Sequence, residues 1–70
     1  MPQTLEKNVD FLVAALSQTF ITALKLGEDG MYERVGFGRV EKYSGDLVRL
    51  RGIDGTVNHF ERGAVRFQRR

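Results

Sequence analysis

Apolar residues near the N-terminus recur at the spacing of an α-helix. They lie three or four positions apart and would form one stripe along a helix surface. The members of this stripe are Leu5, Val9, Leu12, Val13 and Leu16. Thr4 is the expected N-cap residue, and Glu6 lies in the first turn, where a carboxylate interacts favourably with the helix dipole. The pattern predicts a helix over about residues 4–17.

Residues 19–26 fit two patterns. Ile21 and Thr22 are β-branched and favour a strand, and apolar positions alternate from residue 20 onward. Phe20 and Leu24 also continue the helical stripe, so periodicity alone leaves continued helix open. Strand is the favoured interpretation.

From residue 27 onward the sequence has the period of β-structure. Strands are predicted at 32–43, 47–51 and 56–61, with a last short strand at 65–68. Glycine and aspartate mark the connections at 27–30, 44–46 and 54–55. The Asp54-Gly55 dipeptide is typical of a type I′ hairpin turn.

The long predicted strand 32–43 changes phase in its middle. Phe37 and Val40 are three positions apart, so a regular strand would place them on opposite faces of the sheet. Gly38 lies between them. We expect a bulge or sharp bend at Gly38 that turns both apolar side chains inward.

These elements form a single domain, residues 1–70, in which no linker or repeat is visible. A helix followed by short strands, one of them strongly bent, predicts a mostly β fold. The expected architecture is a five-stranded, antiparallel SH3-like barrel with strands over about 19–68 and an N-terminal helix. A domain of this size buries only about 60% of its unfolded surface. The short last two strands also leave edges to be paired, so we predict a closed homo-oligomer.

The charge is unevenly distributed. Residues 1–35 contain three bases and five acids, a net charge of −2, whereas residues 36–70 contain eight bases and four acids, a net charge of +4. Seven of the eight bases are arginine, which contacts phosphate with two parallel hydrogen bonds and stacks on bases. The basic half is compatible with nucleic acid as a partner, but on composition alone an ordinary solvated surface with a basic tail is the favoured interpretation.

The sequence offers few groups for catalysis. It has no cysteine and one histidine, His59, and no glycine-rich phosphate loop opens a helix. The acidic positions 28, 29 and 33 match no EF-hand spacing. We therefore expect no enzyme activity, no metal, no cofactor and no small-molecule substrate. His59 could line a surface site or stack on a base, but a structural role is the more common one for a lone strand histidine.

The longest apolar stretch, residues 11–16, is six residues long, whereas a membrane span needs roughly 20. No basic segment precedes it, as a signal peptide would require. We expect a cytoplasmic protein that does not contact membranes. Among the aromatic residues, Tyr32 and Tyr43 lie next to loops and are better placed to stack on a base than the phenylalanines, which a small barrel needs for its core.

Three short motifs in this order resemble the Sm-like proteins, in particular the bacterial Hfq branch. Phe11-Leu12-Val13-Ala14-Ala15-Leu16 is similar to the family's Phe-Leu-x-x-Leu helix before its first strand. Gly38-Arg39-Val40-Glu41-Lys42-Tyr43 is similar to the glycine bend and the hydrophobic-acidic-x-aromatic stretch of its second strand. Arg62-Gly63 matches the Arg-Gly step between the last two strands of the eukaryotic and archaeal branch.

The resemblance implies a ring of subunits that binds RNA without chemistry. It covers about residues 5–70 and has three departures. Ser44, Leu47 and Val48 replace the family's uridine-binding residues, Phe60-Glu61-Arg62 replaces the Tyr-Lys-His step of Hfq, and the loop at 27–33 is longer than usual for Hfq. The RNA-contact residues expected here are Arg62, Gly63, Tyr43, Arg49, Arg51 and His59. Charge in the tail would add sequence-independent attraction through Arg66, Arg69 and Arg70. The alternative is an oligomeric scaffold or protein-interaction barrel without nucleic acid, in which the arginines pair with acids.

Overall fold

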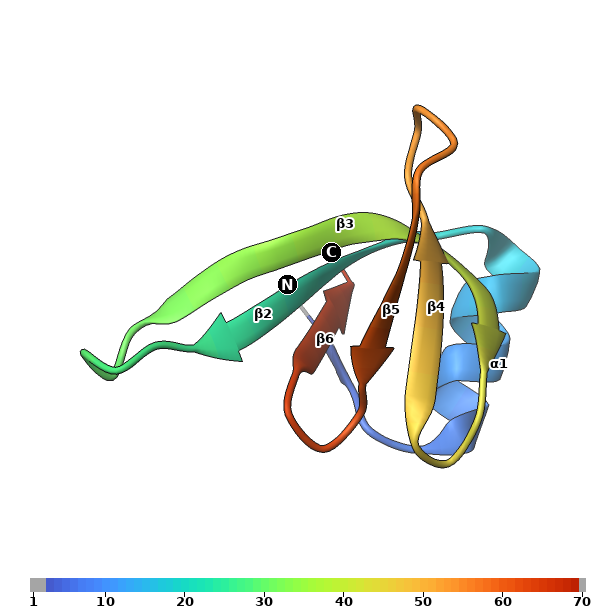
Figure 1. Ribbon diagram of the computed structural model, residues 1–70. Coiled ribbons are helices and arrows are strands. Elements are labelled where there is room, and N and C mark those ends of the chain that lie inside the picture. The colour runs from blue at the N-terminus through green and yellow to red at the C-terminus, as the bar shows by residue number, and fades with distance from the viewer. Residues whose placement is uncertain (1–2, 70) are drawn as a thin grey trace.

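One antiparallel sheet of six strands and one short helix make up residues 3–69, the part of the chain described by the computed structural model (Figure 1). The elements are β1 (Gln3–Leu5), α1 (Asn8–Ser17), β2 (Phe20–Leu26), β3 (Tyr32–Tyr43), β4 (Leu47–Arg51), β5 (Val57–Glu61) and β6 (Arg66–Arg69). The strand order in the sheet is β1-β6-β2-β3-β4-β5. Arg70, the last of the predicted tail contacts, lies outside the described residues.

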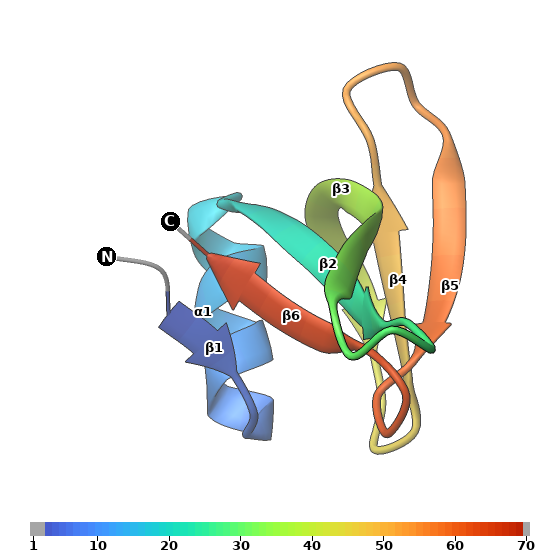
Figure 2. The same ribbon diagram turned by 90° about the vertical axis from the view of Figure 1, so that its left-hand side faces the viewer.

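The predicted mostly β, antiparallel fold with an N-terminal helix is confirmed, but the strand count is wrong and the predicted closure is not observed. The sheet is strongly curved and open, with β1 at one edge and β5 at the other (Figure 2). The additional strand is β1, which pairs with β6 and sets Leu5 opposite Phe67. Both side chains are buried, so Leu5 contributes to the core from an extended segment and not from a helix.

The helix therefore begins later than predicted, at Asn8, and Thr4 is not its N-cap. Asp10 lies in the first turn, and its Oδ2 accepts hydrogen bonds from the backbone N–H groups of Glu6 (3.0 Å) and Lys7 (2.9 Å). The bond from Lys7, the N-cap residue, is half of a capping box, and the bond from Glu6 holds the chain just before the helix. At the other end Gln18 adopts a left-handed conformation, with φ of 54°, and stops the helix.

The predicted apolar stripe of the helix does not face the sheet. Phe11 and Ala14 are the helix residues that are buried, and they lie on the opposite side. Phe11 packs edge-on against Phe67, with ring centroids 5.4 Å apart. The core lies between this narrow face of α1 and the sheet, and its strand residues include Ile21, Val48 and Leu50.

The strand predictions hold along most of the chain. The disputed segment is strand β2, with Ile21 and Ala23 buried. Strands β3 and β4 have the predicted bounds, β5 begins one residue later than expected, at Val57, and β6 is shifted by one residue, to Arg66–Arg69. Figure 1 shows β3 as the long, bent strand that crosses the whole molecule.

The bend of β3 differs in detail from the prediction. The register of the sheet shifts at two places, one opposite the Ala23–Leu24 step and one between Val40 and Lys42. Gly38 lies between these irregularities, paired with Ile21. Val40 is buried as predicted, but Phe37 is 39% exposed, and its ring packs on Phe20 on the outer face. The prediction that both side chains turn inward is thus wrong for Phe37.

The β2–β3 and β4–β5 hairpins have the same type of turn, and each turn has a Gly-x-Asp-Gly sequence. In the second, the Gly52 N–H donates to the Thr56 carbonyl (2.8 Å) and the Gly55 N–H to the Gly52 carbonyl (3.0 Å). Asp54 Oδ1 accepts from the Thr56 N–H (3.0 Å), and Gly55 has φ of 85°. This is a three-residue loop whose last residue is left-handed, and not the predicted two-residue type I′ turn.

Candidate nucleic-acid interface

A row of basic side chains crosses three neighbouring strands. The sheet register sets Lys42 of β3 opposite Arg49 of β4, and Arg49 opposite His59 of β5. Alternate residues of β4 point to opposite faces, so buried Val48 and Leu50 place Arg49 on the outer face. We call Lys42, Arg49 and His59 the basic row.

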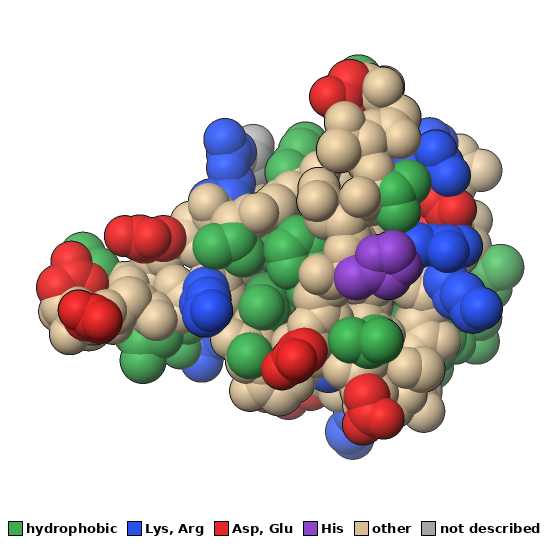
Figure 3. Space-filling model, in the orientation of Figure 1, with side chains coloured by type: hydrophobic (Ala, Val, Ile, Leu, Met, Phe, Trp, Pro, Cys, Tyr) green, Lys and Arg blue, Asp and Glu red, His purple; other side chains and the backbone are tan. Residues whose placement is uncertain are grey.

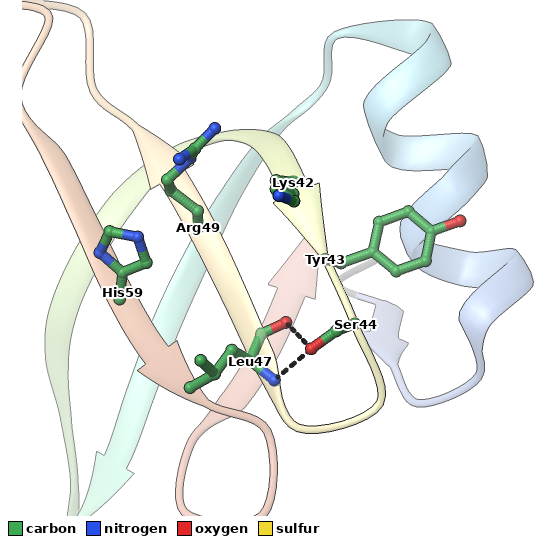
Figure 4. Close-up of a pocket in the computed structure, with 6 residues that line it drawn as sticks. All are labelled: Lys42, Tyr43, Ser44, Leu47, Arg49 and His59. Carbon is green, nitrogen blue, oxygen red and sulfur yellow. Dashed lines mark hydrogen bonds between the residues drawn. The ribbon is translucent and has the colours of Figure 1, made fainter.

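The basic row lines a shallow pocket of about 350 Å³ together with Tyr43, Ser44 and Leu47. Arg49 lies between Lys42 and His59, and Leu47 adds an apolar side chain at the turn (Figure 4). The Ser44 Oγ accepts a hydrogen bond from the Leu47 N–H (3.1 Å), which fixes the turn below the pocket. The pocket thus combines cationic donors, an imidazole ring and an apolar wall.

Like charges face each other across this part of the sheet. Lys42 opposes Arg49, and in the next row Arg39 opposes Arg51. Such pairs destabilise a sheet, because directly opposite side chains are close together. A bound anion would remove this repulsion.

Glu41 supplies part of the countercharge from within the molecule. Its carboxylate accepts two hydrogen bonds from Arg51 (2.6 and 3.0 Å) and lies 3.2 Å from Arg49 Nη2. The hydrogen bond from Arg51 lowers the pKa of Glu41, and the same contact raises the pKa of Arg51. One acid among Lys42, Arg49 and Arg51 leaves a net charge of +2 (three bases minus one acid).

These basic side chains gather beside the histidine on one face of the molecule, with an acid among them (Figure 3). Arg49 is held with its Nε buried and without a hydrogen-bond acceptor among the described residues. An unpartnered buried donor costs stability. Because this nitrogen is buried, a ligand at the surface could not accept a hydrogen bond from it.

Tyr43, predicted to stack on a base, uses its ring inside the molecule. The ring points from β3 toward α1 (Figure 4) and stacks on Phe11 with centroids 6.0 Å apart. Tyr43 still lines the pocket, but its ring packs against the helix. The exposed ring of the basic row is the imidazole of His59.

Arg62, predicted as a principal RNA contact, binds the chain itself. Its guanidinium donates hydrogen bonds to Asn8 Oδ1 (2.6 Å), to the Ser44 carbonyl (2.6 Å) and to the Glu6 carbonyl (2.9 Å). It also lies over the Phe11 ring, 4.5 Å from the centroid. These contacts tie the start of α1 to the β3–β4 turn and place Arg62 outside the pocket of the basic row.

The other predicted contacts are separate from the basic row. Gly63 is exposed in the loop before β6, and a side chain there would meet no atom within 4 Å. Arg66 lies over the Tyr32 ring, 4.8 Å from its centroid, and Arg69 pairs with Ile21 in the sheet. Arg51 adjoins the row but its guanidinium is held by Glu41.

Lys42, Ser44 and Leu47 line the pocket but were not predicted as site residues. The 44–46 turn contained the necessary information, because pairing of Ser44 with Leu47 sets a register in which Lys42 lies opposite Arg49. Placing His59 in the pocket depends on the length of the β4–β5 loop, which was predicted as two residues and has three.

Within residues 3–69 no group of three or more histidine, aspartate or glutamate side chains is arranged to hold a metal ion. No helix in the same range is long and apolar enough to cross a membrane. Comparison of the chain with protein-family models, curated proteins and solved structures finds no match.

Proposed function

We propose that this protein binds single-stranded RNA without catalysis, as a subunit of an Sm-like homo-oligomeric ring. The observation that carries the RNA-binding proposal is the register of the sheet, which aligns Lys42, Arg49 and His59 on one outer face. The ring is proposed from the sequence resemblance and from the two open sheet edges.

A phosphate group fits the chemistry of the basic row. Its oxygens would accept hydrogen bonds from Lys42 and Arg49 and would relieve the repulsion between these two side chains. The exposed His59 ring offers a stacking surface for a neighbouring base, and Leu47 offers an apolar wall. Contacts of this kind are sequence-tolerant, since every nucleotide has a phosphate and an aromatic base.

The proposal is tested by fluorescence anisotropy with labelled U-rich and A-rich RNA over a range of salt concentrations. Lys42→Ala removes an exposed cation of the basic row, and we expect weaker binding and a salt dependence reduced by about 0.7 in log–log slope, the value for one phosphate contact on a single strand. Arg34→Ala is the matched control, because it removes an exposed cation from the part of β3 near the β2–β3 turn.

Equal affinity and equal slope for wild type and Lys42→Ala would contradict the basic row as the RNA site. A preference for one of the two RNA sequences would show that bases as well as phosphates are read. The experiment also tests the predicted tail contribution, which the structure moves into strand β6, because Arg66→Ala should lower the affinity at low salt only.

A second candidate, a protein-interaction scaffold, is favoured by the pairing of Arg49 and Arg51 with Glu41. Pairing with acids is what this alternative requires of the arginines. Absence of RNA binding at low salt, together with self-association, would decide for the scaffold.

A further inference from the structure

Four apolar side chains project from the outer face of α1. Val9 is 55% exposed, Leu12 43%, Val13 46% and Leu16 75%. Their spacing of three and four residues aligns them along the helix opposite buried Phe11 and Ala14. We call these four residues the outer stripe. Figure 3 shows apolar side chains projecting at the right-hand margin, where α1 lies in Figure 1.

The helix is thus apolar on both sides. A surface helix of a globular domain normally presents polar side chains to water, and a helix that is apolar all round is buried. The sheet covers only the narrow face formed by Phe11 and Ala14. A contiguous apolar patch on the remaining face is a feature of interaction surfaces.

A second copy of the same helix fits the outer stripe when the two helices run antiparallel. The positions 9, 12, 13 and 16 are symmetric about their midpoint, so Val9 would meet Leu16 of the partner and Leu12 would meet Val13. Such a contact is self-complementary, as a two-fold interface requires. Branched aliphatic side chains at this spacing interdigitate between antiparallel helices.

Charge is compatible with the same arrangement. The N-terminal end of α1 carries Glu6, Lys7 and Asp10, and the Arg62 guanidinium lies against it, so this end has a net charge of zero (two bases and two acids). The C-terminal end adjoins Arg39, whose Nη1 donates to Gln18 Oε1 (3.4 Å). Antiparallel pairing places each Arg39 beside the Glu6 and Asp10 end of the other copy, whereas parallel pairing would bring the two Arg39 side chains together.

We propose that the outer stripe of α1 is a two-fold interface between copies of this chain. It joins subunits through helices and is independent of the sheet edges, so it would pair two rings, or two single subunits where no ring forms. The outer stripe shares no residue with the pocket of the basic row.

The first test is the mass of the assembly by light scattering. Leu16→Glu places a charge in the outer stripe at its most exposed position, where folding does not depend on it, and we expect the mass to fall by half. Ile53→Glu is the matched control, since Ile53 is 83% exposed in the β4–β5 loop and should leave the mass unchanged. An unchanged mass for Leu16→Glu would overturn the proposal.

The second test uses the absence of cysteine from the sequence. Val9→Cys and Leu16→Cys chains, mixed under oxidising conditions, should form disulfide-linked dimers with each other and not with themselves. Self-linked dimers of each variant would indicate parallel helices and would contradict the two-fold arrangement. Circular dichroism of each variant confirms that the sheet is retained.

A membrane surface is the competing occupant of an apolar helix face. Vesicles of neutral and of anionic lipid provide the probe, in a flotation experiment with the wild-type protein. The proposal expects no flotation with either vesicle. Flotation that Leu16→Glu abolishes, without a change in mass, would assign the stripe to lipid instead.

Discussion

Gly38 lies in the middle of β3, where the end of β4 approaches its backbone. A Cβ atom at this position would lie 2.6 Å from the Arg51 carbonyl oxygen and 2.8 Å from its carbon. The obstruction is main chain in a paired strand, so it cannot move aside as a side-chain end would. The sequence predicted a special role for this glycine from the phase of its neighbours, and the structure gives close approach of backbone as the physical reason.

We expect Gly38→Val to destabilise the fold by about 3 kcal/mol, because both strands must separate to admit the side chain. In a domain of this size that corresponds to a fall in melting temperature of more than about 10 °C. Gly63→Val is the control, because a side chain there enters open space. Thermal unfolding followed by circular dichroism measures both, and an equal effect of the two substitutions would contradict the explanation.

Arg62 shows why the contacts of single residues are harder to predict from sequence than strands are. Its position in an Arg-Gly step suggested a nucleic-acid contact, yet its partners Glu6 and Asn8 are 56 and 54 positions away along the chain. Local pattern contains no information on contacts at that separation. Arg49 differs, because the residues opposite it belong to adjacent strands of two consecutive hairpins.

At the scale of elements, hairpin loop length decides which residues share a face. A two-residue turn at Asp54-Gly55 would set His59 opposite buried Leu50, whereas the observed three-residue loop sets it opposite Arg49. A shift of one residue moves a side chain to the other face of a sheet. Strand bounds could be predicted from alternation, but the composition of the basic row depended on this one turn.

Helix α1 illustrates a second limit of periodicity. The spacing of apolar residues correctly predicts a helix and its stripe, but it does not state which side packs on the sheet. Phe11 and Ala14 form a small face with one large side chain, and this face fits between Tyr43 and Phe67. Strand β1 escaped detection because three residues are too few to display a period of two.

The start of α1 makes its stability depend on pH. Backbone hydrogen bonds from Lys7 and Glu6 lower the pKa of Asp10 below its ordinary value of 3.8. The ionised form is thus favoured by folding, and the stabilisation is complete above the unfolded pKa and lost as pH falls through the folded pKa. We expect Asp10→Asn to lower the melting temperature at pH 7, and the difference from wild type to narrow below about pH 4.

The control for this effect is Asp46→Asn, which removes the same charge from the β3–β4 turn. No hydrogen bond to the Asp46 carboxylate is present among residues 3–69, so the melting temperature at pH 7 should change little. Asp54 also has a lowered pKa, through its hydrogen bonds with Thr56, and it contributes to the acid sensitivity of both proteins equally. A pH-independent effect of Asp10→Asn would show that the carboxylate charge is not the cause.

At the scale of the whole molecule, the charged side chains and the unpaired sheet edges are both unevenly distributed. The β2–β3 hairpin carries Glu28, Asp29 and Glu33 at one end of the molecule, and the basic row lies across β3, β4 and β5 away from it (Figures 1 and 3). The two open edges of the sheet, β1 and β5, belong to opposite ends of the strand order. Pairing of unlike edges between copies is a head-to-tail contact, which closes into a ring if its rotation permits.

Strand β5 provides the test of edge pairing. Asn58 lies opposite buried Leu50, on the core-facing side of the edge strand, and is itself exposed. Asn58→Lys places a charge where a neighbouring strand would pair, a device that natural sheets use to keep their edges single. We expect light scattering to show the ring reduced to units joined only through α1. Ile53→Lys, in the adjacent loop, is the control and should leave the mass unchanged.

Wild-type mass should be independent of concentration at tens of micromolar, since a closed ring has a fixed number of subunits and an open chain of strands would continue to grow. A wild-type monomer at that concentration would contradict edge pairing altogether.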